Sequence, residues 1–258
     1  MVETLYVWYR TLTRMKTRIL GIITQGELGG AQQFLTQLAH ALDPERFELS
    51  VAWGSSSGGD LAGLLPAGTT THQLTHLVRL LHPWHDMRAV SEIQDLIART
   101  TPHIVLAMSS KAGFVASWAV ARYNSRHSSA PIASVYRIGG WAFNDPRPWW
   151  ERALYRTLER MSARHKDIIV VNNAHDLEQA RRLGIKPKRQ LLCIHDGIAP
   201  LQTPPYSKEE ARIELAKLIP SLDTTRPIVG TIANFYATKD IPNLLRAATE
   251  LDPSTQVV

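Results

Sequence analysis

Short apolar runs bounded by turn residues recur along the chain as far as His195. They cover Arg18–Thr24, Phe47–Trp53, His103–Met108, Pro131–Tyr136, Asp167–Asn172 and Gln190–His195. Continuous apolar runs of this length are typical of strands buried in a parallel sheet. Between them, apolar residues at helical spacing predict helices over Ala31–Leu42, Met87–Arg99, Gly113–Tyr123, Trp149–Arg164 and His175–Leu183. This alternation of strands and helices predicts a doubly wound α/β layer.

The pattern changes after His195, where a stretch with no apolar period contains Pro200, Pro204 and Pro205. Such a stretch indicates a linker. Beyond it the sequence predicts a helix over Ser207–Leu218 with a Ser207/Glu210 capping box, and then the elements Pro227–Ala233 (strand), Asp240–Leu251 (helix) and the start of a strand at Gln256. We therefore expect a loose extension (1–15), an α/β domain (16–198), a linker (199–206) and the beginning of a second, incomplete domain (207–258).

The composition fits a folded soluble enzyme, with 44% hydrophobic and 20% charged residues in 258 positions. Cys193 is the only cysteine, which excludes an internal disulfide and a cysteine-based zinc site and favours a reducing compartment. No stretch approaches the roughly 20 apolar residues of a membrane-spanning helix. Residues 1–14 make a poor signal peptide, because Glu3 and Arg10 interrupt their apolar positions.

The net charge of +6 favours anionic partners, and composition alone does not choose among nucleic acid, anionic lipid and phosphorylated ligands. One local feature is a ladder of arginines on the predicted helix Trp149–Arg164, namely Arg152, Arg156, Arg160 and Arg164. These arginines would form a cationic face for anionic lipid headgroups. A merely solvated face is the favoured alternative, because Glu151 and Glu159 dilute the charge.

Three strand-to-helix junctions contain candidate binding residues. Gly29 and Gly30 open the first helix, where backbone amides and the helix N-terminus suit a phosphate; a tight turn that needs glycine is an equal alternative. The second junction places Ser109, Ser110 and Lys111 at the carboxyl edge of the sheet, where ligands of such sheets bind, unless the serines only cap the helix. At the third, Gly139-Gly140-Trp141 offers a ring to stack on a sugar or base, or a core-facing loop.

The histidines His72, His76, His82 and His85 are close in sequence, but their spacing fits no metal-binding helical pair, and we expect chance clustering rather than zinc. No two aspartates are separated by a single residue, so a metal-binding carboxylate pair of that spacing is absent. We expect metal-independent chemistry without a cofactor.

In their order and spacing, these junctions resemble the retaining glycosyltransferases of family 4, whose GT-B architecture has two facing Rossmann-like domains. The similar segments are Gly29-Gly30-Ala31-Gln32, Ser109-Ser110-Lys111-Ala112-Gly113, Gly140-Trp141-Ala142-Phe143, Leu183-Gly184-Ile185, Ile194-His195-Asp196-Gly197-Ile198, Val229-Gly230-Thr231-Ile232-Ala233-Asn234 and Lys239. The resemblance implies a complete N-terminal Rossmann-like domain with a doubly wound parallel sheet, followed by a truncated second Rossmann-like domain.

The resemblance also implies roles for individual residues. Lys239 would stabilise the donor diphosphate, Gly29, Gly30 and Asn234 would contact the donor phosphate or sugar, and the acceptor or sugar would contact Gln32, Ser109, Ser110, Lys111, Gly140 and Trp141. Three departures from the family pattern matter. Gly139 stands where the family usually has a sugar-contacting histidine, Asn234 stands where it often has arginine, and its paired glutamates would lie beyond Val258.

The resulting hypothesis is a retaining transferase that moves a sugar from a nucleotide-diphosphate sugar to a hydroxyl of a glycan or lipid-linked acceptor in cell-envelope synthesis. Such an enzyme would act in the cytoplasm or at the inner face of the plasma membrane, with no nucleic acid partner, and this chain alone would be inactive. A non-catalytic glycan- or partner-binding remnant and another GT-B-like enzyme, such as a sugar-nucleotide epimerase, are the alternatives.

Overall fold

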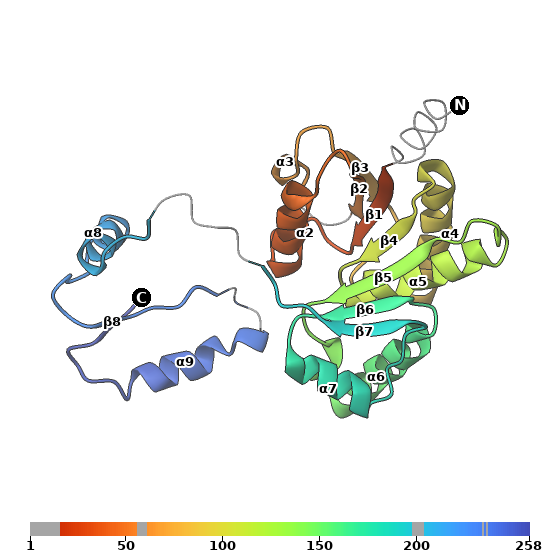
Figure 1. The fold of residues 1–258 in the computed structure, drawn as a ribbon. Coiled ribbons are helices and arrows are strands. Elements are labelled where there is room, and N and C mark those ends of the chain that lie inside the picture. Colours follow the sequence, from red (N-terminus) through yellow and green to blue (C-terminus); the bar gives the residue numbers. More distant parts are fainter. Residues whose placement is uncertain (1–15, 56–60, 198–203, 234, 236) are drawn as a thin grey trace. The chain divides into compact units, whose positions relative to one another are not determined.

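The structure is a computed structural model that describes residues 16–55, 61–197, 204–233, 235 and 237–258. The chain divides into two compact units, Met1–Gly197 and Ile198–Val258. The first unit contains a large sheet with helices on both faces, and the second contains two longer helices and a two-stranded sheet (Figure 1).

The sheet of the first unit has seven strands in the order β3-β2-β1-β4-β5-β6-β7, and every neighbouring pair is parallel. The strands are β1 (Thr17–Ile23), β2 (Phe47–Gly54), β3 (Thr70–Leu74), β4 (Ile104–Ala107), β5 (Ala133–Ile138), β6 (Ile168–Val171) and β7 (Gln190–Cys193). The six predicted strands are confirmed. The prediction missed β3, because this edge strand buries only Leu74 and so lacks an apolar run.

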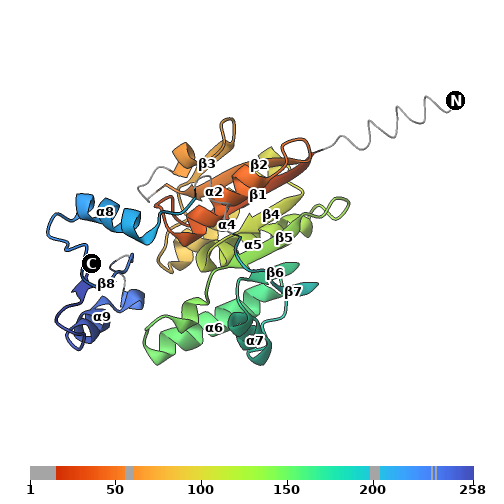
Figure 2. The same cartoon turned by 60° about the vertical axis from the view of Figure 1, so that its left-hand side comes forward.

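Helices cover both faces of the sheet, and each face has its own core. They are α2 (Gly30–Ala41), α3 (Leu61–Leu64), α4 (Pro83–Thr100), α5 (Ser110–Asn124), α6 (Trp149–Ala163) and α7 (Ala174–Arg182), with a short 3-10 turn η1 (Ala142–Asn144). Leu20 and Ile22 of β1 pack with α4, α5, α6 and α7, whereas Ile23 packs with α2 and α3. The alternation of side chains along β1 therefore serves both cores. Figure 2 shows α6 and α7 beside the β6–β7 end of the sheet.

Local sequence explains where several helices begin and end. Side chains of Ser109 and Asn173 accept hydrogen bonds from backbone amides in the first turns of α5 and α7. Gly184 follows α7 with a φ of 68°, the left-handed conformation that favours glycine. The predicted end of this helix at Leu183 is confirmed, since Leu183 is its C-cap residue.

Gly113, in the first turns of α5, allows the Tyr136 ring of β5 to approach the helix. A Cβ atom built at Gly113 would lie 2.4 Å from Cε2 of Tyr136. That ring is buried and its hydroxyl donates a hydrogen bond to Glu159, so it has little room to move. Position 113 therefore needs glycine for the packing of α5 on the sheet.

We expect Gly113→Ala to destabilise the first unit by about 1–3 kcal/mol, the usual cost of overpacking a core. Urea unfolding followed by far-ultraviolet circular dichroism measures the change. Gly30→Ala is the matched control, because a Cβ there meets nothing within 4 Å, and it should unfold at nearly the wild-type midpoint. Equal midpoints for the two variants would contradict the packing role of Gly113.

The arginine ladder of α6 is less exposed than the sequence predicted. Arg152 and Arg156 are only partly exposed: Nε of Arg152 donates to the carbonyl of Phe143, and the Arg156 guanidinium lies 5.7 Å from the Phe143 ring centre. Of the ladder, Arg160 and Arg164 are exposed. Lipid binding by this cationic face stays a prediction; in this structure half of the ladder, Arg152 and Arg156, packs against the η1 turn.

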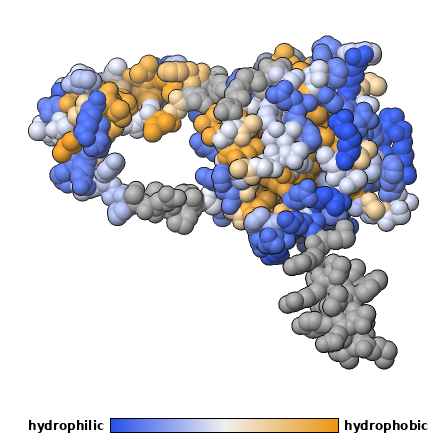
Figure 3. All heavy atoms as spheres, turned by 90° about the horizontal axis from the view of Figure 1, so that it is seen from above, coloured by the Kyte–Doolittle hydropathy of each residue, from blue (hydrophilic) through white to orange (hydrophobic). Residues whose placement is uncertain are grey.

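The second unit contains α8 (Lys208–Leu218), β8 (Ile228–Val229), η2 (Ala237–Lys239), α9 (Ile241–Ala248) and β9 (Gln256–Val257), and β8 pairs with β9 in parallel. The Ser207/Glu210 capping box of α8 is confirmed. The strand predicted over Pro227–Ala233 is shorter, with two residues in β8. Apolar side chains reach the surface in both units (Figure 3). No helix in the described part of the chain is both long and apolar enough to cross a bilayer.

Candidate functional site

The strand order reverses between β1 and β4, and this switch point opens the carboxyl edge of the sheet. The chain leaves β1 toward α2 on one face and leaves β4 toward α5 on the other. Ligands of open α/β sheets bind in the crevice formed by such a reversal. Here the first residues past the two strands meet, since Oγ1 of Thr24 lies 2.6 Å from Oγ of Ser109.

A cavity of about 200 Å³ lies at this edge. We call it the polar crevice. It is lined by Thr24 and Gln25 after β1, by Ser109 and Ser110 after β4, and by further side chains from the loop before α4, helix α5, the segment after β5 and helix α6. These further residues are Arg79, Leu81, Lys111, Phe114, Ala142, Asp145, Arg147, Tyr155, Leu158, Glu159 and Ser162. The hydroxyl, amide and charged groups of the lining suit a ligand with many hydroxyls.

Of the predicted residues at the second junction, Ser109 and Ser110 line the crevice, and Ser109 also caps α5. Lys111 lines it too, but its ammonium is already engaged. Nζ of Lys111 donates to the carbonyl of Leu80 at 2.8 Å and forms an ion pair with Asp86, and the residue is buried. Lys111 therefore fixes the loop before α4 at the crevice rather than projecting a free charge.

The predicted glycine turn lies beside the crevice, at the N-terminus of α2. Gly30 is exposed, and the N-cap residue Gly29 provides no capping side chain, so no side chain of the N-cap satisfies the first amides of this helix. Gln32 is buried, and its Nε2 donates to the carbonyl of Gln25, 2.7 Å away. Gln32 thus holds the turn against the end of β1, and this bond connects the turn to the crevice.

At the third junction, Gly140 is exposed, whereas Trp141 is 1% exposed and lies in the core. Its ring stacks on Phe143 with 5.5 Å between ring centres, and its Nε1 donates to the carbonyl of Asp176. The prediction that Trp141 contacts a sugar is therefore wrong for this structure. The alternative of a core-facing loop describes it.

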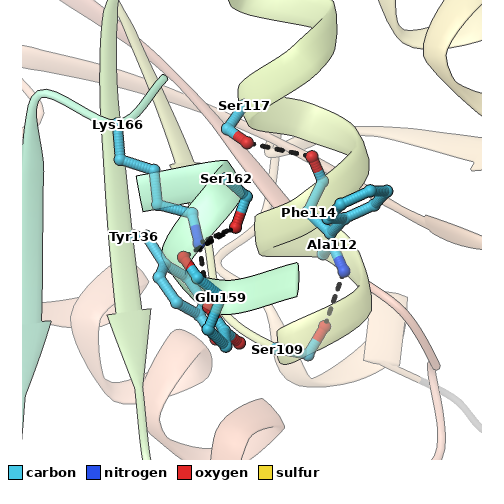
Figure 4. Close-up of polar contacts among 8 residues, drawn as sticks. All are labelled: Ser109, Ala112, Phe114, Ser117, Tyr136, Glu159, Ser162 and Lys166. Atoms are coloured by element: carbon cyan, nitrogen blue, oxygen red, sulfur yellow. Dashed lines mark hydrogen bonds and ion pairs between the residues drawn. The ribbon is translucent and has the colours of Figure 1, made fainter. Parts of the chain in front are cut away.

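Behind the crevice, a buried ion pair joins α6 to the turn that precedes β6, and a hydrogen bond from Tyr136 of β5 joins the same carboxylate to the sheet (Figure 4). Nζ of Lys166 lies 3.1 Å from Oε2 of Glu159 and 3.0 Å from Oγ of Ser162, and the hydroxyl of Tyr136 donates to Oε1 of Glu159. Burial raises the pKa of Tyr136 well above its usual range, and the Glu159 charge adds to this, so the phenol stays a donor. Burial lowers the pKa of Lys166, while Glu159 opposes the shift.

Charge at the open side of the crevice is balanced. Arg147 pairs with Asp145 and with Glu151. Burial alone would lower the pKa of Arg147, but the hydrogen bond to Glu151 and the charges of Tyr155 and Asp145 outweigh it and raise the pKa. The guanidinium therefore remains charged, and together with Asp145 it provides both donors and acceptors for a polar ligand.

The end of the first unit is anchored to the sheet by Arg137. Its guanidinium bonds to Asp196 and lies 4.1 Å from the Phe34 ring centre. Burial would raise the pKa of Asp196, but hydrogen bonds from Arg137 and Asn172 hold it below its usual value. A Cβ atom at Gly139 would lie 3.1 Å from Nη1 of Arg137, so arginine occupies the space where a side chain at 139 would begin.

In the second unit, the structure places Lys239 at the end of η2, exposed. Asn234, the other predicted donor contact of this unit, lies outside the described residues. The roles of both stay predictions.

The clustered histidines lie before and within the start of α4. Nδ1 of His76 is 3.4 Å from Nδ1 of His85, and His82 caps α4 by accepting from the amide of His85. Within the described ranges, no three His, Cys, Asp or Glu side chains come together in a way that could hold a metal ion.

Several crevice residues escaped the sequence analysis. Thr24 and Gln25 could have been found, because Thr24 ends the first predicted strand and Gln25 directly follows it. Asp145, Glu159 and Ser162 gave no comparable signal, since they belong to a loop and a helix whose facing side depends on packing.

The fold and the crevice define the class: an α/β domain of the kind that forms the N-terminal half of GT-B glycosyltransferases. The glycosyl transferase 4-like domain matches residues 29–193, more than half of the chain. The chain belongs to this family. No curated protein matches the sequence.

Solved structures share the GT-B fold. Sucrose-phosphate synthase from Thermosynechococcus elongatus superposes with a TM-score of 0.69 at 15% identity, over 93% of this chain and 61% of that one. The lipopolysaccharide outer core galactosyltransferase WaaB gives 0.56 at 12%, over 93% and 59%. A putative UDP-N-acetylglucosamine 2-epimerase from Listeria monocytogenes gives 0.57 at 17%, over 94% and 62%. The chain thus spans about three fifths of each of these structures.

Proposed function

We propose that this chain provides the acceptor-side domain of a glycosyltransferase that uses a nucleotide-diphosphate sugar. The observation that supports this most directly is the polar crevice at the β1/β4 switch point, where Thr24, Gln25, Ser109 and Ser110 present hydrogen-bonding groups. A sugar acceptor offers many hydroxyls, and such groups bind them through short, directional hydrogen bonds. Membership of the glycosyl transferase 4-like family agrees with this assignment.

The donor side of the proposal concerns the diphosphate. The uncapped amides at the N-terminus of α2, at Gly30, would bind phosphate oxygens, and Lys239 would offset the charge of the leaving diphosphate. Neither contact needs a metal ion, so we propose metal-independent transfer. Retention of configuration rests on the family resemblance. The cell-envelope role rests on the family resemblance, and the cytoplasmic location rests on the single cysteine.

A sugar-nucleotide epimerase is the second candidate, and the structural likeness to a putative UDP-N-acetylglucosamine 2-epimerase favours it. The two activities differ in their need for an acceptor. An epimerase interconverts a sugar nucleotide alone, whereas a transferase releases the nucleotide only as the sugar reaches a hydroxyl. A glycan-binding remnant would do neither.

We expect the 258-residue protein by itself to transfer no sugar, because the paired glutamates of the family would lie beyond Val258. The test incubates it with radiolabelled nucleotide sugars and sugar acceptors, beside a protein translated from the same DNA through to its natural stop codon. We expect the longer protein to form a glycoside whose anomeric configuration, read by nuclear magnetic resonance, matches the donor.

Transfer by the 258-residue protein would overturn the placement of the donor residues. Interconversion of a sugar nucleotide without acceptor would identify an epimerase. A stop codon directly after Val258, with glycan binding and no turnover, would identify a binding remnant.

A further inference from the structure

An apolar hollow of about 420 Å³ adjoins the polar crevice. We call it the apolar groove. Its apolar lining comes from α4, α5 and α6 and includes Met87, Val90, Phe114, Trp118, Leu154 and Leu158. Leu81, Phe114 and Leu158 line the crevice as well as the groove. One ligand can therefore contact the polar crevice with a hydroxylated part and the apolar groove with a hydrocarbon part.

The groove leaves large apolar side chains in contact with water. Met87 is 74% exposed, Leu154 41% and Trp118 39%. The polar residues of its lining are already engaged, since Asp86 pairs with Lys111 and His82 caps α4. Contact between apolar side chains and water is unfavourable in free energy. Exposed apolar patches of this kind mark binding sites.

We propose that the apolar groove holds the hydrocarbon chain of an amphipathic acceptor whose hydroxylated head lies in the polar crevice. Calling this ligand an acceptor rests on the proposed function. The change of polarity at Leu81, Phe114 and Leu158 matches a ligand with a polar head and an apolar tail. A free sugar would leave the groove empty, and a purely apolar ligand would leave the polar crevice without a ligand.

The first test varies the length of the alkyl chain of the ligand. Alkyl glucosides from hexyl to dodecyl, kept below their micellar concentrations, are titrated into the protein by isothermal calorimetry. Each added methylene that enters the groove should raise the affinity about fourfold, which corresponds to about 0.8 kcal/mol per buried methylene. The gain should stop once the groove is full. An affinity that does not depend on chain length would overturn the proposal.

A pair of variants on α6 gives the second test. Leu154→Glu places a charge in the groove and should weaken dodecyl glucoside binding by about tenfold or more, since a charge disfavours an apolar site. Met161→Glu is the matched control, because Met161 is 48% exposed on the same helix and does not line the groove. Both positions are exposed, and circular dichroism verifies that both variants fold. Equal weakening in the two variants would contradict the assignment.

A lipid surface is the competing source of hydrocarbon. Sedimentation with phosphatidylcholine/phosphatidylglycerol vesicles, together with failure to bind any alkyl glucoside, would assign the groove to membrane docking and overturn the proposal. These binding measurements need no turnover. If the longer protein fails to transfer sugar while the chain-length dependence persists, the proposed function alone is removed. If it transfers sugar but Leu154→Glu leaves dodecyl glucoside binding unchanged, the groove alone is removed.

Discussion

Glu159→Ala is expected to lower the free energy of unfolding of the first unit by about 3–5 kcal/mol, because it leaves Lys166 buried without its counter-charge. Lys166 is completely buried and pairs with Glu159 within 3.1 Å. The same substitution removes the acceptor for the hydroxyl of Tyr136. Urea unfolding, followed by tryptophan fluorescence, measures the loss. A change below 1 kcal/mol would contradict the buried ion pair.

The effect of Glu159→Ala should also depend on pH. The pKa of Lys166 is already lowered by burial, and removing Glu159 removes the charge that opposes this shift. A lysine whose folded pKa lies below its unfolded value binds fewer protons when folded, so the free energy of unfolding rises with pH from the folded pKa up to about 10.4. The variant should therefore recover part of its stability in alkaline buffer.

Two further variants separate charge from packing. Glu151→Ala on the same helix removes a partly exposed pair with Arg147 and should cost less than about 1 kcal/mol. The double variant Glu159→Gln/Lys166→Met removes both charges and keeps an acceptor for Tyr136. We expect it to be more stable than Glu159→Ala, because neutral replacement of a buried pair leaves no unpaired charge.

Trp141→Ala is expected to cost about 3–5 kcal/mol, the usual loss when a large aromatic side chain is deleted from a core. The ring is 1% exposed and stacks on Phe143, and its Nε1 bonds to the carbonyl of Asp176. This side chain therefore joins the loop after β5 to α7. Thermal unfolding measures the loss of stability.

Trp149→Ala is the control for this substitution, since Trp149 is 81% exposed at the start of α6 and its removal should change stability by less than about 0.5 kcal/mol. Comparing the two variants decides whether Trp141 packs in the core or stacks on a sugar. If Trp141→Ala kept full stability and abolished glucoside binding, the ring would be a sugar-stacking residue after all.

Only part of the candidate site could be predicted from the sequence. Ser109 and Ser110 were found because they follow an apolar strand directly, and parallel strands present their carboxyl ends at one edge. Lys111 was found too, but the sequence did not reveal its ion pair with Asp86, which lies 25 positions earlier. Trp141 was assigned to a ligand because its junction contains glycines, yet its ring faces inward.

Helix α6 shows why the remainder could not be predicted. Its arginines recur every four residues, and that spacing correctly indicates one side of a helix. Which side packs inward depends on the neighbouring elements. Arg152 and Arg156 lie against the η1 turn and Glu159 is buried on Lys166, while Leu154 and Met161 are left exposed.

The sequence by itself determined six strands, five helices and the parallel α/β class of the first unit, because burial on both faces requires continuous apolar runs and helices require their own period. Family membership also followed from the order of short motifs. Only the tertiary structure decided the position of edge strand β3, the buried Glu159–Lys166 pair and the apolar groove beside the crevice. These features depend on contacts between residues far apart in the chain, which a local pattern does not encode.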